Sequence, residues 1–302
     1  MRNLFSDGDI ICFLGDSITA RGILCAEVYQ TLGKKKRIKC YNCGVSGSTT
    51  RNANDYLYSH CLNYNPTHVA IMFGINDINR TYYSDSYTAP DKDENIREAL
   101  EIHKSCYEEI VKKCIAFGAK VILSIPVPYD EVSEGAEENL RCQRGLDESA
   151  EFVRHLAEKY GCEIVDYDKM MRPMLSEGVI SGDRVHPTDY GYHVMAQVFM
   201  RDTGIIDECD FATPFVFEKW NEERYEAERA LKDIYFVEYC AIFRKAREER
   251  LTFAEKKALA LSLIEKHEHP GIKEWLGIYA KEIDFREEYE SMLIEKSIFV
   301  KE

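Results

Sequence analysis

Two short motifs, far apart in the chain, carry the side chains from which a reactive serine can be built. GDSIT at residues 15–19 closes an apolar run, and DRVHP at residues 183–187 holds an aspartate and a histidine three positions apart. A serine hydroxyl is a weak nucleophile, so it attacks an ester carbonyl only when a base takes its proton and a third group orients that base. Ser17, His186 and Asp183 provide one of each. The pattern predicts a serine hydrolase.

Two further segments have the groups needed to stabilise the charge that such an attack creates. NCGVSG occupies residues 42–47, and GIND at residues 74–77 directly follows an apolar run. The attacked carbonyl becomes an oxyanion, which requires N–H donors fixed in position. The backbone N–H of Gly44 and the carboxamide of Asn76 are suitable donors, and the N–H of Ser17 can be a third.

These four segments, in this order, resemble the blocks of the SGNH (GDSL) hydrolase family over roughly residues 8–205. The resemblance implies that Ser17 is the nucleophile, His186 the general base and Asp183 the group that orients it. It also implies an oxyanion hole formed by Ser17, Gly44 and Asn76. The α/β-hydrolase elbow, the Walker loop, the dinucleotide-binding glycine motif and the His-Glu-x-x-His zinc motif are all missing from the sequence.

Short apolar segments alternate with segments of helical periodicity through the first two thirds of the chain. The apolar segments are rich in valine and isoleucine, as is typical of strands buried on both faces of a parallel sheet. They occupy residues 10–14, 38–43, 68–73, 120–125 and 163–166. We therefore predict an α/β fold with a doubly wound, five-stranded parallel sheet. The resemblance implies the flavodoxin-like strand order 2-1-3-4-5, with the site at the carboxyl edge of the sheet.

The strand signals stop near residue 210. We predict a catalytic domain over residues 1–210 and an all-helical C-terminal extension over 211–302. The extension has capping-box patterns at Thr252/Glu255 and Asp284/Glu287, and one of its helical faces is apolar, formed by Ile272, Trp275, Leu276 and Tyr279. This face can pack on the catalytic domain, line its cleft or form a homodimer, and the sequence does not distinguish these alternatives.

Composition excludes several classes of partner. The net charge of −14 argues against nucleic acid or an anionic membrane surface, because both attract basic proteins. No apolar run approaches the roughly 18 residues of a membrane span, and acids stand where a signal peptide would be apolar. We expect a cytoplasmic protein whose eleven cysteines are reduced. Cys40 and Cys43 have Cys-x-x-Cys spacing without a second such pair, so we expect neither a metal nor a cofactor.

Three polar residues near these motifs are expected to have structural roles. Asp16 and Asp77 flank site residues at predicted strand ends, where aspartate commonly stabilises turns. His103 lies on an apolar helical face, which favours a hydrogen-bonded core histidine over a catalytic one.

The substrate is the least determined feature. Four tyrosines follow strands on the site's side of the sheet and can stack on sugars, pack against acyl chains or be ordinary loop residues. They are Tyr82, Tyr83, Tyr87 and Tyr129. A group of acids would repel polyanionic substrates if it borders the cleft: Asp130, Glu131, Glu134, Glu137 and Glu138.

We therefore expect a small, neutral carboxylic ester as substrate, with a short acyl group, acetyl especially, on a carbohydrate or other small metabolite. One alternative is a lysophospholipase or acyl-thioesterase that acts on longer chains. Another is a non-catalytic binding protein that works through the helical extension.

Overall fold

Five parallel strands form the central sheet of the protein. A computed structural model describes residues 3–134, 137–179, 183–249 and 251–281. The strands are β1 (Ile10–Gly15), β2 (Lys39–Gly44), β3 (His68–Met72), β4 (Lys120–Ile125) and β5 (Glu163–Asp166). Their order is β2-β1-β3-β4-β5 and every pairing is parallel. The predicted fold class and strand order are confirmed.

The strand register brings the functional segments to one edge of the sheet. Gly15 at the end of β1 pairs with Gly44 at the end of β2 and with Met72 at the end of β3. The three strands therefore end level with one another. The loops that follow them carry Ser17, residues 45–48 and Asn76, so these loops meet at the carboxyl edge, where open α/β sheets bind ligands.

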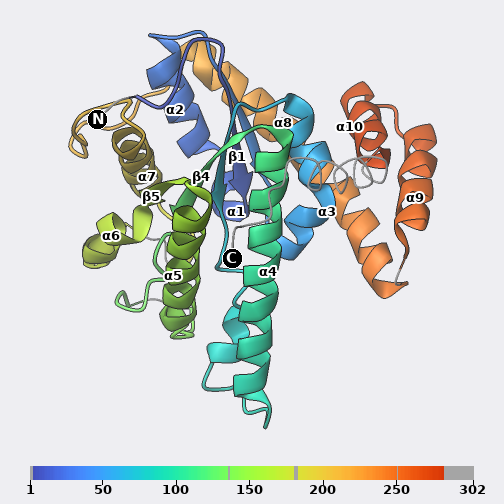
Figure 1. Cartoon of the computed structure of the whole chain (residues 1–302), viewed down its shortest axis with the longest axis horizontal. Helices are drawn as coiled ribbons and strands as arrows, with labels where there is room; N and C mark the ends of the chain where they lie inside the picture. Colours follow the sequence, from blue (N-terminus) through green and yellow to red (C-terminus); the bar gives the residue numbers. More distant parts are fainter. Residues whose placement is uncertain (1–2, 135–136, 180–182, 250, 282–302) are drawn as a thin grey trace.

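Helices cover both faces of the sheet, because successive side chains of a buried strand point to opposite sides. Phe13 belongs to the core under α2 (Ile23–Gly33) and α7 (Asp189–Asp202), whereas Leu14 belongs to the core under α3 (Thr50–His60) and α4 (Lys92–Phe117). Figure 1 shows α2 and α7 on one side of β1 and α3 and α4 on the other. The sheet is thus doubly wound.

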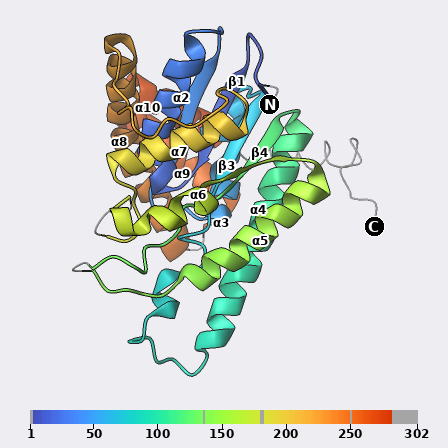
Figure 2. The ribbon, with the colours of Figure 1, turned by 90° about the vertical axis from the view of Figure 1, so that its left-hand side faces the viewer.

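The remaining elements of the catalytic part are shorter or lie at the edge of the sheet. Helix α5 (Gln143–Tyr160) lies beside α4, as Figure 2 shows. The short elements are α1 (Ser17–Ala20), α6 (Tyr167–Met171) and the 3-10 turns η1 (Leu62–Tyr64), η2 (Arg80–Tyr83) and η3 (Arg172–Glu177). Helix α1 matters most for function, since it begins at Ser17.

Three helices form the described part of the C-terminal extension: α8 (Lys219–Glu248), α9 (Phe253–Lys266) and α10 (Pro270–Ala280). The predicted capping box of Thr252 and Glu255 is present at the start of α9, and the one at residues 284 and 287 lies outside the described residues.

The predicted apolar face lies on α10, where Trp275 and Leu276 are buried in the same core as Tyr56 and Leu57 of α3. The extension therefore packs on the catalytic part (Figure 1). In the described part of the chain, no helix has the length and apolar character needed to cross a membrane.

Candidate active site

The structure brings Ser17, His186 and Asp183 into one hydrogen-bonded chain. Ser17 Oγ lies 2.8 Å from His186 Nε2, although the two residues are 169 positions apart. His186 Nδ1 lies 2.6 Å from Asp183 Oδ2. When Nδ1 donates to the carboxylate, Nε2 is the acceptor that can take the serine proton. The arrangement has the chemistry of nucleophile, base and orienting acid.

Asp16 fixes the turn on which Ser17 sits. It is the N-cap of α1, and its Oδ1 accepts the N–H of Ile18 at 2.9 Å. Its side chain is buried, and this burial raises the pKa of Asp16 to about 7. Ser17 is the first residue of α1, so its own N–H has no acceptor within the helix and can point to a substrate. The expected turn-stabilising role of Asp16 is confirmed.

Asp183 organises its own loop in addition to contacting the imidazole. Its Oδ1 accepts the backbone N–H groups of Val185 at 3.0 Å and His186 at 2.9 Å. This is the local turn that aspartate side chains often form. Oδ2 is thereby left facing His186 Nδ1. One carboxylate therefore fixes both the conformation of the loop backbone and the orientation of the His186 imidazole.

Arg184, which the sequence reasoning did not single out, attaches this loop to the rest of the protein. Its φ of 65° lies in the left-handed region, and its side chain is buried. The guanidinium donates to the carbonyls of Asp130, Ser133 and Glu137 at 2.8–3.0 Å. Since Asp183 and His186 lie on either side of it, Arg184 holds both by anchoring the backbone between them. Only its place inside the Asp-x-x-His motif pointed to it.

Asn76 follows β3, as expected, and its side chain is partly committed. Nδ2 donates to the carbonyl of Ser48 at 3.0 Å. A carboxamide has two N–H donors, so one remains for a substrate oxygen. Asn76 lines a second cavity, of about 330 Å³, and is not part of the lining of the larger cavity that contains Ser17.

Asp77 and His103, the two other residues expected to have structural roles, make hydrogen bonds that join elements of the fold. Asp77 Oδ1 accepts the N–H of Thr50, the first residue of α3, at 2.7 Å and lies 3.1 Å from His103 Nδ1. His103 is fully buried, and its Nε2 lies 2.7 Å from Ser149 Oγ. Asp77 and His103 therefore tie the end of β3 to α3, α4 and α5.

Gly44 has a packing role that its predicted oxyanion role does not explain. A Cβ at this buried position would lie 2.3 Å from the backbone nitrogen of Ala20, so only glycine lets α1 pack this closely. The Gly44 N–H donates to Asn42 Oδ1 at 3.1 Å and is thus already engaged. The role of Gly44 in the oxyanion hole stays a prediction, and this bond tells against it.

Gly47, in the same loop, has the properties of an available donor. Its φ is 73°, it is exposed, and no atom lies within 4 Å of the position of a Cβ. Within the described part of the chain its N–H makes no hydrogen bond. Gly47 is therefore a second candidate for the glycine donor.

A lysine from the extension holds the end of β2. Lys232 Nζ, on α8, donates to Asn42 Oδ1 and to the carbonyl of Gly44, both at 2.8 Å. Burial lowers the pKa of Lys232 to about 8. Lys232 escaped the sequence analysis because nothing near residue 232 indicates a partner 190 positions away.

The cavity that contains the triad has a volume of about 760 Å³ and is bounded partly by the extension. Ser17, Asp183 and His186 line it together with side chains of α8 and α10. Its aromatic lining consists of Tyr41, Tyr64, Tyr192, Phe236 and Trp275.

The four tyrosines that follow strand ends do not line the triad cavity. Tyr83 and Tyr129 are buried, Tyr82 lines the second cavity, and Tyr87 lines neither. Of the roles that the sequence left open, this placement favours ordinary structural residues over contact with a substrate at the triad. The acids of the segment 130–138 are likewise absent from both linings in the described part of this loop.

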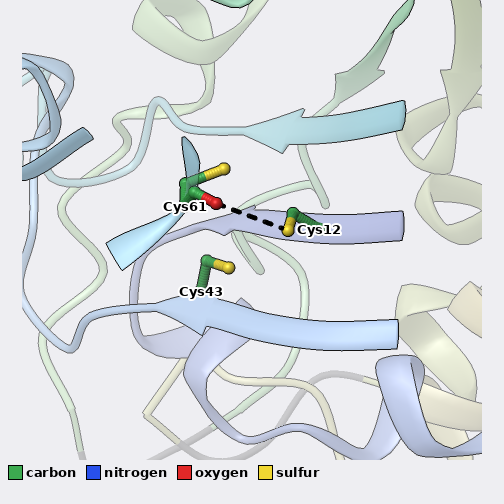
Figure 3. Close-up of side chains that lie close together, drawn as sticks. All are labelled: Cys12, Cys43 and Cys61. Carbon is green, nitrogen blue, oxygen red and sulfur yellow. Dashed lines mark hydrogen bonds between the residues drawn. The ribbon is translucent and has the colours of Figure 1, made fainter. Parts of the chain in front are cut away.

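The cysteine pair with Cys-x-x-Cys spacing is split between the two faces of the sheet. Cys40 lies in the core under α2, and Cys43 in the core under α3. Cys43 instead faces Cys12 and Cys61, and the three Sγ atoms lie within 4.8 Å of one another (Figure 3). This is a spacing that a thiophilic ion can bridge, but a metal ligand must be a thiolate. Burial raises the pKa of the Cys12 and Cys61 thiols well above the usual range, which favours their protonated form. At Cys43, burial is outweighed by hydrogen bonds from these two thiols and by the charge of Lys232, which together lower its pKa.

A sequence model of the GDSL-like Lipase/Acylhydrolase family matches residues 13–194. The chain belongs to this family. It is a GDSL-type carboxylic ester hydrolase.

Individual GDSL relatives differ in how much of the chain they match. An acetylxylan esterase from Geobacillus stearothermophilus is 25% identical over 222 residues, which is 65% of this chain and 94% of that protein. A structure of this esterase superposes with a TM-score of 0.56 at 22% identity, over 70% of this chain and 100% of its own. A gut microbial diltiazem-metabolizing enzyme superposes with a TM-score of 0.69 at 17% identity, over 97% of this chain and 95% of its own.

Proposed function

We propose that this GDSL hydrolase removes short acyl groups, acetyl above all, from a carbohydrate or another small alcohol. The observation that carries the proposal is the hydrogen-bonded chain from Ser17 through His186 to Asp183, which opens on a large cavity. No element of this chemistry requires a metal ion.

The reaction proceeds through an acyl-enzyme. His186 Nε2 takes the proton of Ser17 as the oxygen attacks the ester carbonyl, and Asp183 stabilises the imidazolium. The N–H of Ser17, the Asn76 carboxamide and a glycine N–H of the 44–47 loop stabilise the oxyanion. His186 then gives the proton to the departing alcohol. Water attacks the acyl-enzyme in the same manner and restores Ser17.

The charged lining of the cavity supports a polar alcohol. Glu228, Arg229, Lys232 and Asp233 all line it. A purely hydrocarbon substituent would have to displace water from these groups, which is unfavourable. The similarity to an acetylxylan esterase supports acetyl in particular. A long-chain lysophospholipase or thioesterase is therefore the weaker alternative.

Chain-length preference is tested with p-nitrophenyl esters from acetyl to palmitoyl. We expect kcat/KM to be highest for acetyl or propionyl and to decrease steadily with length. A maximum at palmitoyl would instead support the long-chain alternative.

The catalytic roles are tested by substitution. Ser17→Ala and His186→Ala should each reduce ester turnover by several orders of magnitude, roughly 10³–10⁶-fold, because the triad acts as a unit and its losses do not add. The double variant should be little worse than either single one.

Circular dichroism serves as the control for folding of these variants. Retention of more than about a tenth of the activity by Ser17→Ala would disprove the nucleophile assignment. A fluorophosphonate probe should label the wild type but not Ser17→Ala, and failure to label the wild type would favour the binding-protein alternative.

A further inference from the structure

The cavity beside Ser17 is a joint product of the catalytic part and the extension. Its inner wall contains Ser17 and His186, and its outer wall consists of side chains from α8 together with Trp275 of α10. The contributing residues of α8 are Glu228, Arg229, Leu231, Lys232, Asp233 and Phe236. A substrate in this cavity therefore touches the extension.

The position of His186 indicates which half of an ester occupies this cavity. The histidine that activates the serine must later protonate the departing alcohol oxygen, so the alcohol leaves on the histidine's side. His186, Pro187 and Thr188 line the large cavity, whereas Asn76 lines the smaller one. The alcohol part consequently lies between His186 and α8.

The size of the cavity exceeds what a small alcohol needs. Its volume of about 760 Å³ lies within the range of about 300–1,000 Å³ that holds drug-sized ligands. Methanol or ethanol would leave it mostly filled with water. An alcohol of one or two rings matches it better.

The side chains of the cavity have the chemistry that recognises rings with polar substituents. Tyr41 and Tyr64 are stacked with ring centroids 4.1 Å apart, and Trp275 meets His60 edge to face at 5.2 Å. Such rigid aromatic groups present flat surfaces to a ring. Arg229 and Asp233 add hydrogen-bonding groups from α8.

Polar contacts from α8 fix its position relative to the loops that follow β1 and β2. Lys232 bonds both Asn42 and Gly44 at the end of β2, and Tyr225 of the same helix donates to the carbonyl of Arg21 at 3.0 Å. These contacts therefore hold the outer wall of the cavity at a fixed position relative to the turn that carries Ser17. The matched family region ends at residue 194, before the extension begins.

From these observations we propose that the C-terminal extension completes a binding site for a ring-bearing alcohol and thereby determines which esters this hydrolase accepts. This inference rests on the proposed esterase function. It adds that α8 distinguishes substrates by their alcohol and leaves the acyl group to the catalytic part.

Two variants of exposed α8 residues test the proposal. Phe236→Ala removes part of the wall, and Asp233→Trp fills the cavity. Val237 lies on the same helix, is 63% exposed and does not line the cavity, so Val237→Ala and Val237→Trp are the matched controls. The substrates are three acetates with the same acyl group: ethyl acetate, 4-methylumbelliferyl acetate and acetylated xylobiose.

We expect Asp233→Trp to lower kcat/KM by about tenfold or more for at least one ring-bearing acetate, chiefly through KM, and to change ethyl acetate by less than about twofold. Phe236→Ala should act in the same direction, and the controls should match the wild type. A loss confined to the xylobiose acetate identifies a sugar alcohol, and one confined to the umbelliferyl acetate identifies an aryl alcohol. Equal effects on all three acetates, or none, would overturn the proposal.

A binding measurement separates this inference from the function on which it rests. Titration calorimetry with xylobiose and with 4-methylumbelliferone measures binding of the alcohol alone to the full chain. If the full chain binds either alcohol and Asp233→Trp weakens that binding, the site is supported, even if no acetate is hydrolysed. Lack of hydrolysis would count against the esterase proposal only. Absence of binding for both alcohols, with ethyl acetate hydrolysed normally, would reject the site while leaving the esterase intact.

Discussion

Ser17 is positioned by its backbone as much as by its hydrogen-bond partners. It stands at the first turn of α1, where Asp16 caps the helix and the Ser17 N–H has no acceptor within the helix. The proposed nucleophile and one proposed oxyanion donor therefore belong to the same residue. Asn76 is the proposed donor whose contribution can be measured most cleanly, because a side chain can be removed and a backbone N–H cannot.

Asn76→Ala should reduce kcat by about 10²–10³-fold with a much smaller change in KM. The hydrogen bond to the oxyanion strengthens as charge develops, so its loss affects the transition state more than the bound substrate. Steady-state kinetics with p-nitrophenyl acetate measure this effect. A thermal melt is the control, since Asn76 also donates to Ser48. A rise in KM with unchanged kcat would mean that Asn76 only binds substrate.

The two glycines after β2 should respond differently to a methyl group. Gly44→Ala places Cβ 2.3 Å from the Ala20 nitrogen, so α1 must shift. We expect the free energy of unfolding to decrease by about 1–3 kcal/mol and the melting temperature to fall accordingly. Gly47→Ala has open space around it and strains only the left-handed backbone, by about 1 kcal/mol. If the Gly47 N–H helps to bind the oxyanion, that strain should lower kcat. Wild-type kcat in Gly47→Ala would argue against Gly47 as a donor.

Which site residues were predictable depended on how local their signal is. Ser17, Asp183 and His186 stand in short motifs whose residue types suggest their chemistry. Arg184 and Lys232 act through contacts with carbonyls 47–54 and about 190 positions away, and a lone arginine or lysine in a sequence has no such signature. The role of the tyrosines stayed open in the sequence, because proximity to a strand end does not determine which way a side chain turns.

At the scale of elements, the strands were predictable to within about a residue. Buried parallel strands consist of continuous apolar runs, and all five residues of β3 are buried. The helices followed from their 3.6-residue periodicity. The packing partners of the helices were not predictable in the same way. An amphipathic pattern indicates that one face of a helix is buried, but it does not identify the element that buries it. The sequence left open whether the extension covers the cleft or forms a dimer, and the homodimer stays a prediction.

The short helix that carries Ser17 makes stability depend on pH. The pKa of Asp16 is raised to about 7, from 3.8, mainly by burial, so the folded protein holds this proton more tightly than the unfolded chain. The protonated Asp16 carboxyl contributes fully to the free energy of unfolding below about pH 4, and this contribution is lost as the pH rises through about 7.

Asp16→Asn can still accept the N–H of Ile18 but has no proton to lose. We expect the free energy of unfolding of the wild type to fall by a few kcal/mol relative to Asp16→Asn between about pH 4 and pH 8. Urea unfolding at a series of pH values measures the difference, in which all other titrating groups cancel. Parallel curves for the two proteins would show that Asp16 stays ionised.

At the scale of the whole molecule, the extension is joined to the catalytic part by both its core and its polar contacts. Residues of α8, α9 and α10 share a hydrophobic core with α3 and with one face of the sheet. Lys232 bonds the end of β2, and Asn221 donates to the carbonyl of Ala26 in α2 at 3.0 Å. The cavity beside Ser17 exists in this form only because both parts are present.

We therefore expect the described parts to unfold together, in one cooperative transition. Leu276 on α10 is completely buried against the core of α3, so Leu276→Ala should destabilise the protein by about 2–5 kcal/mol and shift the whole transition to lower temperature. Leu261 on α9 is 48% exposed, and Leu261→Ala should have an effect within about 0.5 kcal/mol. Differential scanning calorimetry, followed in parallel by esterase activity, makes the comparison. If Leu276→Ala splits off an early transition while activity survives to the original melting temperature, the extension is an independent unit and cannot be a wall that the active site requires.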